Sequence, residues 1–309
     1  MNKNILKFYS LIIGGFVSIQ TYAQDVNSQM IETEKEVIAN TESILDVKSD
    51  SVKEAIANPF SISQHRRNYF LPFTYATNPN AVTVDGLDSS NVDNFEAKYQ
   101  VSMKLPLYIE KGTTSGLYMG FTLKSFWQVY NSEVSKPFRE TNYEPEVYYS
   151  WQNELSILGF KFNNIQAGIN HQSNGQTNVL SRSWNRLFAS ALFSDDTSFY
   201  YIKTWYRIPE DEKETPTSAT GDDNPDITRY LGNIELGFGT TWGKTNISAL
   251  VRNNLRTSNN KGSIELNLTY PLTTNYDLLF QYFNGYGDSL IDYNRHQQRV
   301  GLGVQLKFL

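Results

Sequence analysis

Three residues whose chemistry suits ester cleavage lie within a short polar segment: His171, Ser173 and Asn185. On a β-strand, His171 and Ser173 project from the same face, because strand side chains alternate with a period of two. If the segment is a hairpin centred on Asn178, His171 lies opposite Asn185, and opposed residues place their Cβ atoms about 4.5–5.5 Å apart. A base, a hydroxyl nucleophile and an amide that orients the base would then meet, as in the triad of a serine hydrolase.

The same segment also has the composition of an ordinary turn. Serine, asparagine and glycine dominate turns for conformational reasons. A histidine and a serine in alternate positions therefore do not define a catalytic site by themselves, and the rest of the chain has to decide between the two interpretations.

Residues 1–23 have the pattern of a secretory signal peptide. Lys3 and Lys7 precede a short apolar core, and residues 21–23 (TYA) resemble a cleavage site. Removing this segment removes two lysines and no acids, so the formal net charge changes from −5 to −7. An acidic chain of this kind is not expected to bind nucleic acid. The chain has no cysteine, which excludes disulfides and thiolate metal sites.

From about residue 67 the chain alternates apolar and polar residues in segments of about ten. In residues 264–270 the apolar side chains stand at even positions and the polar ones at odd positions. Aromatic residues make up 14% of the chain. Alternation with aromatic residues near segment ends is typical of a transmembrane β-barrel, whose closure satisfies every strand hydrogen bond in lipid. A soluble β-sandwich also alternates, but the predicted signal peptide and the strand count favour the barrel.

The sequence predicts an all-β fold, a transmembrane antiparallel barrel of twelve strands. The candidates lie near 67–76, 95–107, 115–130, 143–153, 161–173, 184–193, 197–207, 229–242, 245–253, 262–270, 276–285 and 298–308. Longer and shorter gaps alternate between them, as outer loops and periplasmic turns do in bacterial barrels. The expected organisation is a signal peptide (1–23), an acidic periplasmic extension (24–66) and the barrel (67–309).

Residue parity places the candidate triad on the lipid-facing side of this barrel. With a periplasmic amino terminus the fifth strand runs outward, and His171 and Ser173 lie at its outer end. Both residues share a strand face with the apolar Ile165, and Asn185 shares a face with Leu187. A polar triad at that height faces lipid head groups and ester bonds.

Two other classes of protein share part of this pattern. A passive barrel, either a narrow pore or a structural membrane protein, shows the same alternation but would keep its polar groups in the lumen. A soluble secreted esterase would partition into water without detergent. The sequence also predicts that Lys98, Glu235 and Glu265 form a polar network that fills the small lumen.

Several longer motifs resemble the bacterial outer membrane phospholipase A family. They are PFRETNYEP (137–145), HQSNG (171–175) with SRSWNRL (181–187), DDNPDIT (222–228) and YGDSLIDYN (286–294). They occur in the family's order, and the resemblance covers most of residues 58–309. It implies a twelve-stranded barrel in the bacterial outer membrane with its active site at the outer leaflet. It also implies a calcium-dependent phospholipase A1/A2, active on lysophospholipids as well, that hydrolyses acyl esters of phospholipids.

The resemblance assigns roles to four residues of the polar segment. Ser173 resembles the family's nucleophile, His171 its general base, and Asn185 the residue that orients this base. The backbone N–H of Gly175 is similar to the family's oxyanion donor.

The resemblance also implies how calcium is held. The catalytic ion is expected at the Ser181 hydroxyl, the Gln176 carbonyl and the carbonyl of Ser135 of the partner subunit. Position 176 is usually arginine in the family, but a backbone carbonyl ligand should survive that change. A second calcium site involves the position of Asp223 together with that of Asn178, where the family has aspartate, and this departure puts the second site in question.

The implied partners are phospholipid substrate, outer membrane lipids and a second copy of the chain, since the family is activated by homodimerisation. Leu123 stands where the family can place a membrane-embedded glutamine at the dimer contact. Apolar contact in lipid gains little over contact with lipid tails. The leucine is therefore expected to weaken or alter dimerisation.

Overall fold

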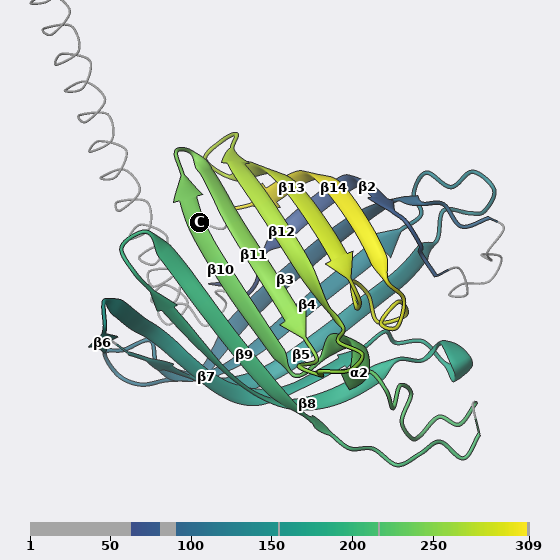
Figure 1. The fold of residues 1–309 in the computed structure, drawn as a ribbon, viewed down its shortest axis with the longest axis horizontal. Coiled ribbons are helices and arrows are strands. Elements are labelled where there is room, and N and C mark those ends of the chain that lie inside the picture. Colours follow the sequence, from purple (N-terminus) through teal and green to yellow (C-terminus); the bar gives the residue numbers. More distant parts are fainter. Residues whose placement is uncertain (1–62, 81–90, 154, 216, 308–309) are drawn as a thin grey trace, which may run out of the picture.

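The computed structural model describes residues 63–80, 91–153, 155–215 and 217–307. The predicted signal peptide and most of the predicted extension lie outside these residues. Within them, no helix is long and apolar enough to cross a membrane. The described residues form one antiparallel sheet that closes on itself, and Figure 1 shows β14 next to β2.

Twelve long strands make up the wall in the part of the chain that the structure describes. They are β2 (Asn68–Ala76), β3 (Phe95–Ile109), β4 (Gly116–Trp127), β5 (Phe138–Gln152), β7 (Phe160–Ser173), β8 (Ser183–Ser194), β9 (Ser198–Ile208), β10 (Ile234–Trp242), β11 (Thr245–Asn253), β12 (Gly262–Pro271), β13 (Tyr276–Gly285) and β14 (Gln297–Leu306). Neighbours pair antiparallel in chain order, and β14 pairs with β2 to close the barrel. The predicted twelve-stranded all-β barrel is confirmed.

Two strands of two residues add to this wall. β1 (Ser63–Gln64) pairs with the part of β3 that lies beyond the amino-terminal end of β2, and β6 (Ser156–Ile157) pairs with the start of β7. β1 brings the last residues of the predicted extension into contact with the barrel.

Two predicted strand starts differ from the structure. β5 begins at Phe138 rather than near 143, because the charged side chains at its start are paired inside the barrel, as Arg139 is with Glu96. β10 begins at Ile234 rather than near 229, because the short helix α2 (Thr228–Leu231) precedes it.

Gly232 ends α2 with a φ of +71°. A Cβ at this position would lie 1.9 Å from the carbonyl oxygen of Asn253. Only glycine tolerates both the left-handed conformation and this close approach, so the helix stops there and the chain enters β10.

The lumen holds buried ion pairs. The Lys98 ammonium lies 2.8 Å from Asp288, and Arg139 lies 2.9 Å from both Glu96 and Asp292. Buried charges are tolerated only when they are paired and hydrogen-bonded. Lys98 therefore belongs to a lumen network, as predicted, and the network joins the barrel wall to the loop between β13 and β14.

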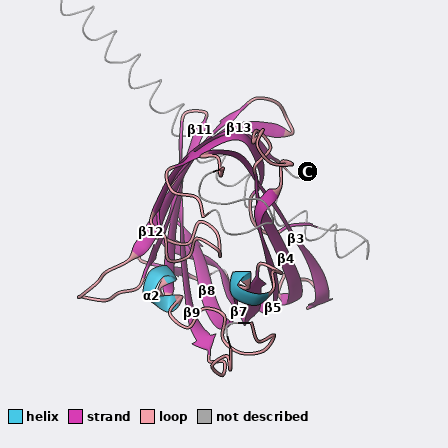
Figure 2. Ribbon diagram, turned by 90° about the vertical axis from the view of Figure 1, so that its right-hand side faces the viewer, coloured by secondary structure: helices cyan, strands magenta, loops and turns pink. Residues whose placement is uncertain are grey.

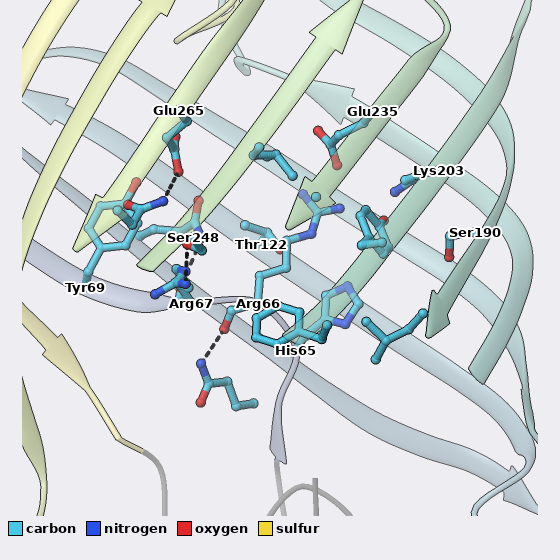
Figure 3. Close-up of a pocket in the computed structure, with 18 of the residues that line it drawn as sticks. His65, Arg66, Arg67, Tyr69, Thr122, Ser190, Lys203, Glu235, Ser248 and Glu265 are labelled. Atoms are coloured by element: carbon cyan, nitrogen blue, oxygen red, sulfur yellow. Dashed lines mark hydrogen bonds between the residues drawn. The ribbon is translucent and has the colours of Figure 1, made fainter. Parts of the chain in front are cut away.

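A cavity of about 1420 Å³ remains inside the barrel (Figure 3). Glu235 and Glu265, predicted to belong to the lumen network, line it, and Glu265 accepts a hydrogen bond from Asn267 at 3.0 Å. Arg66 and Glu144 also line the cavity, and the Arg66 guanidinium lies 2.9 Å from the Glu144 carboxylate. The three residues of the candidate triad do not line this cavity.

Apolar side chains close the end of the barrel that carries the long loops. Ile227 and Leu231 of the α2 segment pack with Leu290 and Tyr293 of the loop between β13 and β14, and Figure 2 shows α2 at this end. The loops therefore pack on one another and provide a firm support for residues at the adjacent rim.

Candidate active site

The β7–β8 ladder joins His171 to Asn185. The two residues lie opposite each other in its register, as the hairpin prediction requires. The distance from His171 Nδ1 to Asn185 Oδ1 is 2.8 Å. Because the amide oxygen only accepts, this contact requires the proton on Nδ1, and in the neutral ring Nε2 then carries the lone pair. This is the tautomer that a general base needs.

Ser173 ends β7 two residues beyond His171, on the same face of the strand. It lies opposite Tyr143 of β5 and Ser183 of β8. The face is the outer one, because Ile169 on it is 55% exposed whereas its neighbour Asn170 is buried inside the barrel. The predicted nucleophile and base therefore stand on the outside of the barrel.

Asn174 organises the loop that follows Ser173, and its importance was missed in the sequence. Its side chain is buried, and Oδ1 accepts from the backbone N–H of Gln176 at 3.2 Å and of Arg182 at 2.9 Å. Its amide nitrogen donates to the Leu180 carbonyl at 2.9 Å. The inward parity of an asparagine directly after the candidate serine was the available signal.

Gly175 follows with a φ of +65°. A Cβ here would meet the ring of Tyr143 at 3.3 Å. The left-handed conformation is one that glycine adopts without steric cost, and it turns the backbone directly beside Ser173. This is the residue whose N–H the resemblance assigns to the oxyanion.

Asp223 links two outer loops at this end of the barrel. It accepts hydrogen bonds from the hydroxyls of Ser181 at 2.7 Å and Ser183 at 3.0 Å, and it pairs with the ammonium of Lys213. Burial alone would raise the pKa of Asp223, but the hydrogen bonds from Lys213, Ser181 and Ser183 outweigh burial and lower it. Since Ser183 lies opposite Ser173, this cluster adjoins the candidate nucleophile.

The oxygen atoms here suit calcium. A carboxylate, a hydroxyl and backbone carbonyls are hard ligands of the kind that calcium prefers, and the Ser181 hydroxyl and the Asp223 carboxylate are already adjacent. In the described chain no cluster of three or more histidine, cysteine, aspartate or glutamate side chains offers a metal site. Calcium would therefore depend on Ser181 and on carbonyls such as that of Gln176.

The contacts of Lys213 and Asn178 show how the residues of the proposed second calcium site are engaged in this structure. The ammonium of Lys213 already balances the Asp223 carboxylate. Asn178 begins a short 3-10 turn and accepts the N–H of Ser181 through its carbonyl at 3.2 Å. The side chains that bond Asp223 in the described residues are those of Lys213, Ser181 and Ser183.

Leu123 lies in the same row of cross-strand neighbours as Ser173. It faces Tyr143 of β5, which in turn faces Ser173 of β7, and on its other side it faces Val101 of β3. Val101 and Tyr143 are 40% and 38% exposed. The predicted dimer contact is thus two strands from the candidate nucleophile. Ser135 lies between β4 and β5, in an outer loop beside this row.

A further side chain, missed in the sequence, completes the surroundings of Asn185. The Asn185 amide nitrogen donates to Glu210 Oε1 at 3.1 Å. Glu210 continues the outward parity of β9 beyond Ile208, which lies opposite Asn185. Pairing β8 with β9 and counting two residues past Ile208 would have found it.

A closed membrane barrel with a histidine–asparagine pair and a serine on its outer surface defines an outer membrane protein with a hydrolase-type site. The family model described as Phospholipase A1 matches residues 45–306. Phospholipase A1 of Escherichia coli (strain K12) is 37% identical over 254 residues, which are 82% of this chain and 83% of that protein. The chain belongs to the phospholipase A1 family.

Solved structures show the same fold. Outer membrane phospholipase A from Escherichia coli superimposes with a TM-score of 0.73 at 37% identity, covering 81% of this chain and 93% of that chain. An outer membrane phospholipase dimer of Salmonella typhi with bound calcium gives a TM-score of 0.72 at 37% identity, with the same coverage. The protein is an outer membrane β-barrel enzyme that hydrolyses phospholipids, so the predicted phospholipid hydrolysis is confirmed and the passive barrel is set aside.

Proposed function

We propose that this phospholipase is a calcium-dependent serine hydrolase whose triad is Ser173, His171 and Asn185. It cleaves acyl esters of phospholipids as a phospholipase A1/A2, and those of lysophospholipids. The observation that carries the proposal is the 2.8 Å hydrogen bond between His171 Nδ1 and Asn185 Oδ1 on the lipid-facing side of the barrel. Ser173 follows on the same strand face, level with the outer leaflet.

His171 acts as the general base. Its Nε2 removes the hydroxyl proton of Ser173 as Oγ attacks the ester carbonyl, and it returns this proton to the departing alcohol. Asn185 holds the Nδ1–H tautomer without a full charge of its own. That alcohol is the lysophospholipid, which leaves at this step. Water then attacks the acyl–serine ester, which releases the fatty acid and restores the Ser173 hydroxyl.

The oxyanion that forms in this attack needs donors that are already in place, and each such donor contributes a few kcal/mol. The N–H of Gly175 supplies one, because the loop is turned at this residue and held by Asn174. Ser181 and the Gln176 carbonyl, with the carbonyl of Ser135 of the partner subunit, would hold calcium. The ion, when bound, adds positive charge beside the oxyanion.

The active form is a homodimer. The apolar row that includes Leu123 and Tyr143 runs toward Ser173 on the outer surface, so a second copy seated on this row would reach the site. The related Salmonella typhi phospholipase is a dimer with bound calcium, which supports this arrangement. Leu123 makes the contact here apolar.

The test is an assay of detergent-solubilised protein on phospholipid vesicles or mixed micelles, with calcium or with a chelator. Ser173→Ala should abolish hydrolysis while its unfolding temperature stays at the wild-type value, because Ser173 is at the surface and makes no lumen contact. Ser190→Ala, which removes a hydroxyl on the lumen face of β8, is the matched control and should stay active. Substantial turnover by folded Ser173→Ala protein would refute the nucleophile.

A further inference from the structure

We propose that Glu210 is a fourth member of the catalytic chain, a positioning residue that fixes the side-chain amide of Asn185. The inference rests on the proposed triad and extends it by one residue. Glu210 acts through Asn185 and does not touch the reacting atoms. Its role is to keep the amide oxygen, and not the amide nitrogen, directed at His171.

The chain of contacts is continuous. Glu210 Oε1 accepts from Asn185 Nδ2 at 3.1 Å, and Asn185 Oδ1 lies 2.8 Å from His171 Nδ1. Along this chain each hydrogen-bond donor meets an acceptor. The carboxylate only accepts, the amide nitrogen only donates, and the amide oxygen only accepts.

The oxygen and NH₂ ends of an asparagine amide are almost identical in shape, so the amide can be turned over with little change in packing. Turning Asn185 over would place its NH₂ group against His171 Nδ1, which would then have to accept. The imidazole proton would move to Nε2, and the base would lose the lone pair that removes the serine proton. A carboxylate on the far side forbids this turn, because it would face the amide oxygen. Through these two hydrogen bonds, Glu210 therefore selects the His171 tautomer that can act as a base.

The position of Glu210 is fixed by the fold. β9 ends at Ile208, opposite Asn185. Two contacts hold the start of the following loop against its end. The backbone N–H of Asp222 donates to the Asp211 carbonyl at 2.7 Å, and Arg207 pairs with Asp222 at 2.5 Å. These ties flank Glu210 and hold its backbone close to the barrel rim.

The carboxylate also supplies the charge that an asparagine triad lacks. Hydrogen bonds with an ionised partner are about twice as strong as neutral ones. A negative Glu210 polarises the Asn185 amide and makes its oxygen a better acceptor for the imidazolium that forms in the transition state. The charge lies one residue further from the base than in a triad with aspartate.

Three single variants test the role of Glu210. Glu210→Gln is isosteric but can offer either an oxygen or an NH₂ group to Asn185, so it removes both the charge and the selection. Glu210→Asp retains the charge. Glu212→Gln is the matched control, since Glu212 is an exposed acid of the same loop, two residues further on.

Glu210→Gln should lower kcat roughly tenfold, which corresponds to about 1.4 kcal/mol of barrier, with KM unchanged because substrate does not contact Glu210. Glu210→Asp should recover part of this loss, and Glu212→Gln should match the wild type. In the double variant, Asn185→Ala with Glu210→Gln should be no slower than Asn185→Ala alone, because Glu210 has nothing left to position.

The tautomer can be observed directly. The chain has three histidines, so ¹⁵N-histidine labelling in detergent gives few signals, and the ring nitrogen shifts report which nitrogen carries the proton. In alkaline buffer the wild type and Glu212→Gln should show His171 protonated at Nδ1, and Glu210→Gln should show a mixture of tautomers.

Wild-type kcat and a single His171 tautomer in Glu210→Gln would overturn the proposal, as would additive losses in the double variant. Failure of the triad itself gives a different result, because Asn185→Ala would then keep full activity. A drop in kcat with an unchanged tautomer would also count against Glu210 as a positioning residue.

Discussion

The hydroxyl of Ser181 donates to the carboxylate of Asp223 at 2.7 Å, although the two residues belong to different outer loops. The bond ties the hairpin that carries the candidate triad to the long loop after β9. Lys213 of that loop pairs with the same carboxylate. A lysine ammonium therefore neutralises the charge that would otherwise attract calcium to this point.

Lys213→Ala should increase the affinity for calcium. Removing a cation next to the Asp223 and Ser181 oxygens removes repulsion and frees a carboxylate, and we expect a roughly three- to tenfold lower Kd. Calorimetric titration in detergent measures it. Lys244→Ala, in the turn between β10 and β11, makes the same charge change away from the site and should leave Kd unaltered. Equal affinities for both variants would contradict the competition.

Lowering the pH should weaken the hydrogen bonds and the ion pair that the Asp223 carboxylate makes with the loop residues around it. The pKa of this group is lowered in the folded protein, so its contribution to stability is complete above the ordinary carboxyl range and is lost as pH falls through the lowered value. The unfolding midpoint of Asp223→Asn should lie below that of the wild type at pH 6. The difference should begin to shrink at about pH 4, the ordinary carboxyl pKa, and should disappear only once the pH falls below the lowered pKa of Asp223. Thermal unfolding in detergent across a pH series measures both midpoints. A difference between the two midpoints that stays constant at every pH would rule out a stabilising role for the ionised Asp223.

Asn185→Ala should reduce turnover without eliminating it. His171 remains a base but loses the acceptor that holds its Nδ1 proton, so the loss should be smaller than for Ser173→Ala. Initial rates on phospholipid in calcium-containing detergent give the comparison. Unchanged activity would mean that the 2.8 Å contact has no catalytic role.

Calcium and self-association should be coupled. If the metal site is completed by Ser135 of the partner subunit, calcium binds only the dimer and must shift the equilibrium toward it by mass action. Dimer content and activity should rise together across a calcium titration followed by analytical ultracentrifugation. Full activity of a monomeric sample would contradict this coupling.

Leu123→Gln tests the apolar contact in the same experiment. A glutamine at this outward position of β4 adds a polar contact in lipid, worth about 0.6–2 kcal/mol, and should reduce the calcium needed for half dimerisation. Val251→Gln, at an outward position of β11, is the matched control. An identical calcium requirement in Leu123→Gln would show that Leu123 lies outside the interface.

The alternation of side chains determined the wall of the barrel and the face that carries the triad. Eight or more alternating residues specify which side of a strand faces lipid, since a slip by one residue would expose every polar group. The symmetry of a hairpin about Asn178 likewise predicts, from the sequence alone, that His171 lies opposite Asn185, as the β7–β8 register shows. These are local properties, and a strand expresses them wherever it lies in the sheet.

Contacts between distant segments were decided only by the tertiary structure. The predicted strand near 143–153 left Arg139 outside it, whereas Arg139 lies in β5 and pairs in the lumen with Glu96 and Asp292, which are distant from it in the sequence. Asp223 meets Ser181, and Glu210 meets Asn185, because the loop after β9 folds back over the rim. The β8–β9 register places Glu210 near Asn185, but the contacts of Arg139 and Asp223 depend on barrel closure and loop packing, which have no period in the sequence.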